Sequence, residues 1–280
     1  FFGSHNHDPG FAVCNNGDLL VVFFTSVFED APEVALMATR LRFGSDQWDW
    51  MSPFIDLPDV NDAAPMLWNE AGNLRFFFGH LHLDATFPFQ WTVSHDNGAT
   101  WSEIKYPKFI NRVGPHTPQP INSAFRDSDG TIYIACDGLG ATSVLYASHD
   151  DGGLWYDTGG RSGGRHTTFA LLKNGDIMGL GGKHSDIDGY MPKSISHDKG
   201  KSWELSNTSF PALGSSQRPT VIRLQSGNLF FASDFQRSDG FQPEGIKERG
   251  SFVALSEDEG KTWLIKKIPG GQLHESKEKR

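Results

Sequence analysis

Two pairs of consecutive residues in the second half of the chain are the clearest candidates for catalysis. Arg165 precedes His166, Lys183 precedes His184, and Arg218 follows further on. An arginine side chain binds a carboxylate through two parallel hydrogen bonds, and histidine gains or loses a proton near neutral pH. Together these residue types favour a site that holds a negatively charged group and moves a proton beside it.

The full candidate set is larger and comes from most of the chain. We predict that the catalytic residues are Arg165, His166, His184, Tyr190 and Arg218. We predict that the substrate is bound by His7, Asp62, His80, His82, His116, Gln119, Lys183 and Arg237. A single histidine is usually structural, so this prediction depends on a scaffold whose loops bring these residues together.

A repeated motif indicates what that scaffold is. The pattern Ser-x-Asp-x-Gly-x-Thr-Trp occurs at 94–101, 148–155, 196–203 and 256–263, and a degraded copy covers 45–48. The second copy has Leu154 in the place of the threonine. An aspartate side chain accepts hydrogen bonds within its own turn, glycine adopts conformations that other residues resist, and tryptophan offers a large apolar surface. Each copy therefore predicts a tight turn whose tryptophan packs between structural units.

A second repeat alternates with the first. Glycine-containing turn signals separate apolar runs at 16–18, 71–73, 129–131, 174–176 and 226–228, which predicts a hairpin at each. Two hairpins in each unit of about 45–60 residues give four strands, the pattern of a β-propeller blade. The strand before each glycine turn then lines the axis. Residues about ten positions before the glycine, such as His7, Asp62 and Arg165, converge at one mouth, opposite the Asp-containing turns.

The Asp-containing motif resembles the Asp box, or BNR repeat, of the sialidase superfamily of β-propellers. The resemblance covers nearly the whole chain and implies an all-β fold, with one propeller domain over residues 1–280. Five units begin near positions 7, 62, 116, 165 and 217, whereas sialidases have six blades and related polysaccharide lyases often have seven. Because an open propeller exposes strand edges, we expect a fragment that lacks one or two C-terminal blades.

Sialidase-like hydrolysis is one reaction that the resemblance implies. Members of that family hold a sugar carboxylate with three arginines, and use a tyrosine nucleophile assisted by a glutamate and an aspartate as acid. Arg165 and Arg218 would be two of the arginines, and Asp62, Asp30 or Glu29 would be the acid. The family's Phe/Tyr-Arg-Ile-Pro motif is absent near the first blade, where residues 5–10 are HNHDPG.

β-Elimination on a uronate is the reaction that we favour. The histidine-rich mouth resembles that of the propeller lyases acting on ulvan and on rhamnose–glucuronate linkages. Arg165 and Arg218 would neutralise the sugar carboxylate, which makes the neighbouring carbon-bound proton removable. His166, His184 and Tyr190 are the candidates for the base and the acid, because their side chains exchange protons.

Three other interpretations stay open. The arginines would form structural salt bridges if a nearby aspartate, such as Asp186, pairs with them. A non-catalytic glycan-binding propeller would use the exposed aromatic run 87–89 as a stacking platform. Two histidines one residue apart, such as His80 and His82, could bind zinc with Asp84, but they lie at a strand end or loop and we do not predict a metal.

The composition excludes several other classes of protein. Lys and Arg number 25 against 34 Asp and Glu, and the resulting net charge of -9 argues against nucleic-acid binding. No apolar run reaches the ~20 residues of a membrane-spanning helix. The two cysteines give no disulfide framework. We expect a monomer without a cofactor, acting on an acidic glycan in a secreted or periplasmic location.

Overall fold

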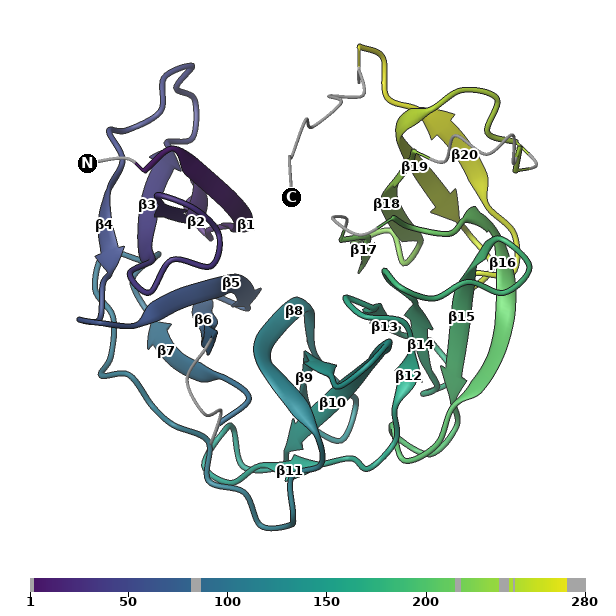
Figure 1. Cartoon of the computed structure of the whole chain (residues 1–280), viewed down its shortest axis with the longest axis horizontal. Coiled ribbons are helices and arrows are strands. Elements are labelled where there is room, and N and C mark those ends of the chain that lie inside the picture. The colour runs from purple at the N-terminus through teal and green to yellow at the C-terminus, as the bar shows by residue number, and fades with distance from the viewer. Residues whose placement is uncertain (1–2, 82–86, 215–217, 237–241, 244, 271–280) are drawn as a thin grey trace.

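The chain folds into five antiparallel sheets in a computed structural model that describes residues 3–81, 87–214, 218–236, 242–243 and 245–270. The sheets follow one another around an arc, and each sheet is one blade of the predicted propeller (Figure 1). Within the described ranges, no helix has the length and apolar character needed to cross a membrane.

The blades have the following bounds. The first contains β1 (His5–Val13), β2 (Leu19–Ser26), β3 (Ala35–Leu41) and β4 (Ser52–Ile55). The second contains β5 (Asn61–Glu70), β6 (Asn73–Leu81) and β7 (Gln90–Ser94), extended by a bridge between Trp91 and Lys105. The third contains β8 (His116–Arg126), β9 (Ile132–Gly138), β10 (Thr142–Ser148), β11 (Tyr156–Asp157) and β12 (Ser162–Gly163). The fourth contains β13 (Thr168–Leu171), β14 (Ile177–Leu180), β15 (Tyr190–Ser196) and β16 (Glu204–Pro211), and the fifth β17 (Thr220–Arg223), β18 (Leu229–Phe235), β19 (Gly250–Ser256) and β20 (Leu264–Lys267).

The order of strands within each blade is the predicted one. Every glycine turn joins the first two strands of a blade, and β1, β5, β8, β13 and β17 are innermost (Figure 1). The Asp-box turns join the third strand of a blade to the segment that follows it. The all-β propeller fold is therefore confirmed. A single domain over residues 1–280 and one or two further blades stay predictions.

Each Asp box is closed by hydrogen bonds within its own turn. In the first copy, the Ser94 hydroxyl donates to Asp96 at 2.7 Å and accepts from the Gly98 N–H at 2.8 Å. Asp96 also accepts the N–H of Thr100 at 2.9 Å and its hydroxyl at 2.6 Å. The last two copies repeat this pattern. The motif is thus a self-contained turn, which is why it can be recognised from eight adjacent residues.

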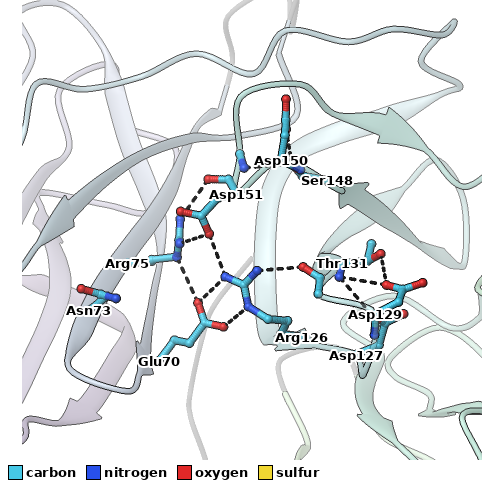
Figure 2. Close-up of polar contacts among 12 residues, drawn as sticks. Glu70, Asn73, Arg75, Arg126, Asp127, Asp129, Thr131, Ser148, Asp150 and Asp151 are labelled. Carbon is cyan, nitrogen blue, oxygen red and sulfur yellow. Dashed lines mark hydrogen bonds and ion pairs between the residues drawn. The ribbon is translucent and has the colours of Figure 1, made fainter.

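The residue between the aspartate and the glycine of each Asp box contacts the preceding blade. These residues are Asn97, Asp151, Lys199 and Glu259, and their φ angles are 60°, 62°, 62° and 62°. Their side chains meet Asn15, Arg75, Asp129 and Lys173 of the preceding blade, respectively. Figure 2 shows the second and third blades joined in this way, where Arg126 contacts both Asp151, at 2.7 Å, and Glu70. The left-handed backbone of the turn therefore aims one side chain across each blade boundary.

Apolar packing joins the same neighbours. Four cores each combine residues of two adjacent blades, and each core includes one Asp-box tryptophan: Trp101, Trp155, Trp203 and Trp263. Trp155 is 1% exposed and packs edge-on against Phe89, with ring centroids 5.0 Å apart. Burial of a side chain of this size stabilises the fold by roughly 3 kcal/mol. The tryptophans therefore fix the position of one blade against the next.

Candidate active site

A cavity of about 1260 Å³ lies at the centre of the arc and is lined by all the innermost strands. Its wall along those strands is mostly apolar, with Leu67, Phe125 and Phe169 among the lining residues. Its ionisable and amide side chains include His7, Asp8, Glu29, Gln119, His166, Lys183 and Arg218. Most of these precede an innermost strand or follow the second strand of a blade, at the mouth opposite the Asp boxes. This concave, polar mouth is the candidate active site.

His166 and Asp137 form the buried centre of the mouth. The Nδ1 atom of His166 lies 2.9 Å from Oδ2 of Asp137, and the backbone N–H of His166 donates to Oδ1 at 2.8 Å. Burial, assisted by the charge of Arg218, lowers the pKa of His166 to about 3. The imidazole is therefore neutral at pH 7. With Nδ1 facing the carboxylate, Nε2 is the nitrogen that can accept a proton.

Arg165 contacts the same carboxylate. Its Nε atom donates to Oδ2 of Asp137 at 3.0 Å, and its NH2 group donates to Gln119 Oε1 at 2.9 Å. Burial alone would raise the pKa of Asp137, but the contacts with His166 and the charge of Arg165 lower it. Asp137 is therefore ionised and orients His166. This is the salt-bridge interpretation of Arg165, with Asp137 as its partner.

Arg218 and Asp8 form a second ion pair at the mouth. Their side chains meet at 2.9 Å and join the fifth blade to the first. Burial raises the pKa of Asp8, although the charge of Arg218 opposes this shift. Asp8 and His166 both have a φ of 56°, in the left-handed region that non-glycine residues rarely adopt. Such strained backbone persists only where the surroundings hold it, and it gathers at functional sites.

Lys183 brings a further positive charge to the cavity. Among the described residues, no carboxylate lies within ion-pair distance of its ammonium group. Burial lowers the pKa of Lys183, and the charges of Arg165 and Arg218 lower it further. Its carbonyl accepts the N–H of Arg165 at 3.0 Å. Gly182 permits this approach, because a Cβ there would lie 1.4 Å from the carbonyl oxygen of Arg165.

Several of the predicted substrate-binding residues lie away from the cavity wall. His80 Nδ1 is 3.1 Å from Oδ1 of Asp62, and Asp62 also accepts the N–H of Leu57 at 2.7 Å. His116 Nδ1 donates to the carbonyl of Gly114 at 2.9 Å. None of these side chains lines the central cavity, whereas His7, Gln119 and Lys183 do.

Three predicted catalytic residues, Arg165, His184 and Tyr190, are also outside the central cavity. His184 lines a smaller hollow beside the mouth, together with Arg165. Tyr190 begins β15 and lines neither hollow. His82 and Arg237 lie outside the described residues.

The structure also describes parts of the chain that concern the aromatic stacking platform and the metal site. In the aromatic run 87–89, Phe89 is fully buried between the second and third blades, whereas Phe87 is 38% exposed. A stacking platform could therefore use only Phe87 of these two rings. In the part of the chain that the structure describes, no group of three histidine, cysteine or acidic side chains is arranged to hold a metal ion.

Asp8 and Asp137 were not among the residues to which the sequence assigned a role. Asp8 and His166 occupy the same position relative to the turn glycine in the first and fourth blades, and Asp137 is the penultimate residue of β9, the second strand of the third blade. Position alone therefore placed them at the mouth. The sequence did not reveal that Asp8 pairs with Arg218 or that Asp137 pairs with His166, because each pair joins residues from different blades.

Comparison with known families and structures agrees with this architecture. A family model described as a BNR repeat-like domain matches residues 17–274. The chain belongs to the BNR repeat-like domain family. A search of the curated proteins found no match.

Solved structures similar to this BNR-repeat chain include sialidases. The Hadza microbial sialidase Hz136 has a TM-score of 0.68 and 16% identity, over 93% of this chain and 58% of that one. The NanB sialidase of Streptococcus pneumoniae, as its K499G mutant, has a TM-score of 0.68 and 9% identity, over 94% and 61%. A Dyadobacter fermentans protein of unknown function has a TM-score of 0.70 and 13% identity, over 96% and 85%. These likenesses show a sialidase-type fold, and the chain spans 58% and 61% of the two sialidases.

Proposed function

We propose that this protein is a glycan-cleaving enzyme that acts at an acidic sugar, by β-elimination on a uronate. One observation carries the proposal. A neutral histidine, His166, is held against an ionised carboxylate, Asp137, in the wall of a cavity that Lys183 and Arg218 also line. A base, its orienting group and two cations therefore meet in one mouth.

The two cations would bind the substrate carboxylate. Lys183 has no carboxylate partner of its own among the described residues, and Arg218 has one, Asp8. A sugar carboxylate placed between them would replace water around the ammonium group and gain a charge-assisted hydrogen bond from the guanidinium. Neutralising that carboxylate makes the proton on the adjacent C5 atom more acidic.

Proton transfer then follows from the environments of two side chains. Nε2 of His166 takes the C5 proton, and Asp137 stabilises the imidazolium that forms. The C4–C5 double bond forms as the bond from C4 to the leaving oxygen breaks. Asp8 is the proposed acid, because burial raises its pKa and a sugar carboxylate bound to Arg218 would replace Asp8 in the ion pair; protonated Asp8 then gives its proton to that oxygen. Arg165 acts as a positioning residue for Asp137, and this proposal gives the acid role to Asp8 in place of His184 or Tyr190.

Sialidase-like hydrolysis is the second candidate. Two carboxylates, Asp8 and Glu29, line the same cavity, as an acid and an assisting base would. A Trypanosoma rangeli sialidase solved in complex with sialic acid is also similar in fold, with a TM-score of 0.62 and 12% identity. In this reaction Asp8 would protonate the glycosidic oxygen. A monomer in a secreted or periplasmic location stays a prediction in both cases.

A panel of uronate polysaccharides and sialosides distinguishes these reactions. Ultraviolet absorbance reports the new double bond of elimination, and an assay of released sugar reports hydrolysis. We expect rising absorbance with the wild type, loss of it in His166→Asn, and no loss in His95→Asn, a matched change in an Asp box. Released sugar without absorbance would support hydrolysis, and binding without either product would support a glycan-binding propeller.

The pH dependence of kcat/KM tests the assigned base. Because the pKa of His166 is lowered to about 3, the base stays unprotonated through mildly acidic pH. We expect activity to be retained well below pH ~6.5, the ordinary pKa of histidine, and to fall only as the pH approaches the lowered value. At higher pH, activity falls as the pH rises through the raised pKa of Asp8. An acidic limb centred near pH ~6.5 would contradict the assignment of His166.

A further inference from the structure

We infer that a second hollow beside the mouth binds the sugar next to the one that is cleaved, so that the substrate is an oligosaccharide; this rests on the proposed function. The hollow has a volume of about 380 Å³. It is lined by Thr117, Gly138, Gly140, Ala141, Arg165 and His184. The first four residues belong to the third blade, and the last two flank the first strands of the fourth blade.

The two hollows share one wall. Arg165 and His166 are consecutive, as are Lys183 and His184, yet His166 and Lys183 line the central cavity. Arg165 and His184 line the second hollow. The hydrogen bond from the Arg165 N–H to the Lys183 carbonyl, at 3.0 Å, joins the two segments. The φ angles of His166 and His184, 56° and 63°, are both left-handed, so the backbone turns at each histidine. The wall is therefore built from two backbone segments and offers side chains to both sides.

The chemistry of the second hollow suits an uncharged sugar ring. Gly138, Gly140 and Ala141 present little side chain, and no atom lies within 4 Å of the place where a Cβ of Gly140 would stand. A pyranose ring can lie against such a surface while the exposed His184 bonds to its hydroxyl groups. The charge of Arg165 is already matched by Asp137, so a second carboxylate gains little there. An acidic sugar bound in the mouth and a neutral sugar bound in the second hollow would be adjacent units of one glycan chain.

Equilibrium binding tests this inference without requiring turnover. Calorimetric titration would compare glucuronic acid with a glucuronate-containing disaccharide and tetrasaccharide. We expect the wild type to bind the oligosaccharides about tenfold or more tightly than the monosaccharide, because one or two net hydrogen bonds are gained. Ala141→Phe, which fills the second hollow, should remove that preference and leave the monosaccharide affinity unchanged. Ala99→Phe makes the same change on the Asp-box rim and should retain the preference.

His184→Ala is the second variant, and it should weaken oligosaccharide binding without affecting the monosaccharide. Equal affinity for all chain lengths, or an Ala141→Phe protein that keeps the wild-type preference, would overturn the inference even if the enzyme cleaves uronates. A preference lost in Ala141→Phe, in a protein that cleaves no glycan, would support the second hollow and reject the proposed reaction. Failure of the wild type to bind any of the three sugars would reject both.

Discussion

The two rims of the propeller use charged side chains in opposite ways. On the Asp-box rim, hydrogen bonds from the residue four positions later lower the pKa of Asp198 and Asp258 to about 2, which favours their charged forms. At the mouth, burial raises the pKa of Asp8 and lowers those of His166 and Lys183, which favours their neutral forms. Exposed turns therefore stabilise the charges that hold the fold, whereas burial at the mouth destabilises the charges of Asp8, His166 and Lys183, although Asp137 beside His166 stays ionised.

The Asp-box rim therefore stabilises the fold, whereas the other rim holds the candidate active site. The Asp boxes repeat the same contacts in successive blades, and Figure 2 shows their charges satisfied across a blade boundary. The mouth has no such repetition, because the blades contribute different combinations of ionisable and amide side chains. The cavity, and the neutral His166 held against Asp137 in its wall, mark the mouth as the candidate functional end. Changes at the two rims should therefore affect different measurements.

Asp137→Asn should give the largest effect on activity. The amide cannot stabilise the imidazolium of His166, so we expect kcat to fall about a hundredfold or more. The control is Asp151→Asn on the other rim, which should lower the melting temperature but leave kcat unchanged. Steady-state kinetics and thermal unfolding of both variants check this. Similar kcat values in the two variants would mean that the two rims do not differ in this way.

Gly182→Ala should have the largest effect on stability. The added Cβ would meet the carbonyl oxygen of Arg165, so the two segments of the shared wall must separate. We expect a loss of about 2–4 kcal/mol in the free energy of unfolding, together with loss of activity. Gly130→Ala is a useful control for the measurement, because no atom lies within 4 Å of its Cβ position, although its own φ of 91° adds backbone strain. A smaller loss in the free energy of unfolding in urea for Gly182→Ala than for Gly130→Ala would contradict the proposed wall.

Arg126→Gln should have a moderate effect confined to stability. It removes the contact with Glu70 that joins the third blade to the second, and the contact with Asp151 within the third blade (Figure 2). We expect a loss of about 1 kcal/mol, because the side chains are partly exposed and Arg75 still pairs with Asp151. A double-mutant cycle with Glu70→Gln measures the coupling across the blade boundary. A coupling of zero would mean that this network does not hold the blades together.

Asp258→Asn should have the smallest effect, seen only in acid. The folded pKa of Asp258 is depressed to about 2, so its contribution is present above pH ~4, the unfolded value, and is lost as the pH falls through ~2. We therefore expect the variant and the wild type to differ in melting temperature at pH 6 and to converge near pH 2. A constant difference across this range would show that the carboxyl charge is not what stabilises the turn.

The fold could be predicted because its signals are local. Ser94, Asp96, Gly98 and Thr100 close one turn within seven residues, and the repetition of this turn fixes the number and order of strands. The glycine turns add the second hairpin. No long-range contact had to be known for either step.

The site was only partly predictable, because its decisive contacts join distant residues. The sequence placed His166 and Arg218 at one mouth, but their partners depend on the angle between blades. Asp62 stands at the position in the second blade equivalent to that of His7, which lines the cavity, yet Asp62 bonds to the Leu57 N–H and lies outside the cavity wall. Irregular register in β1, β5 and β8 moves such residues off the expected alignment. Counting along the chain cannot reveal these shifts.

The arrangement of the four inter-blade cores has a consequence for cooperativity. Because each core joins neighbours along the chain, the described arc behaves as a linear array of nearest-neighbour units. Its first and fifth units each have one such core, so their amides should exchange hydrogen faster than those of β9 in the middle. The ion pair between Asp8 and Arg218 joins these two end units. Local opening of either end would therefore also carry Asp8 or Arg218 away from His166, and the fraction of molecules competent for catalysis would follow the free energy of that opening.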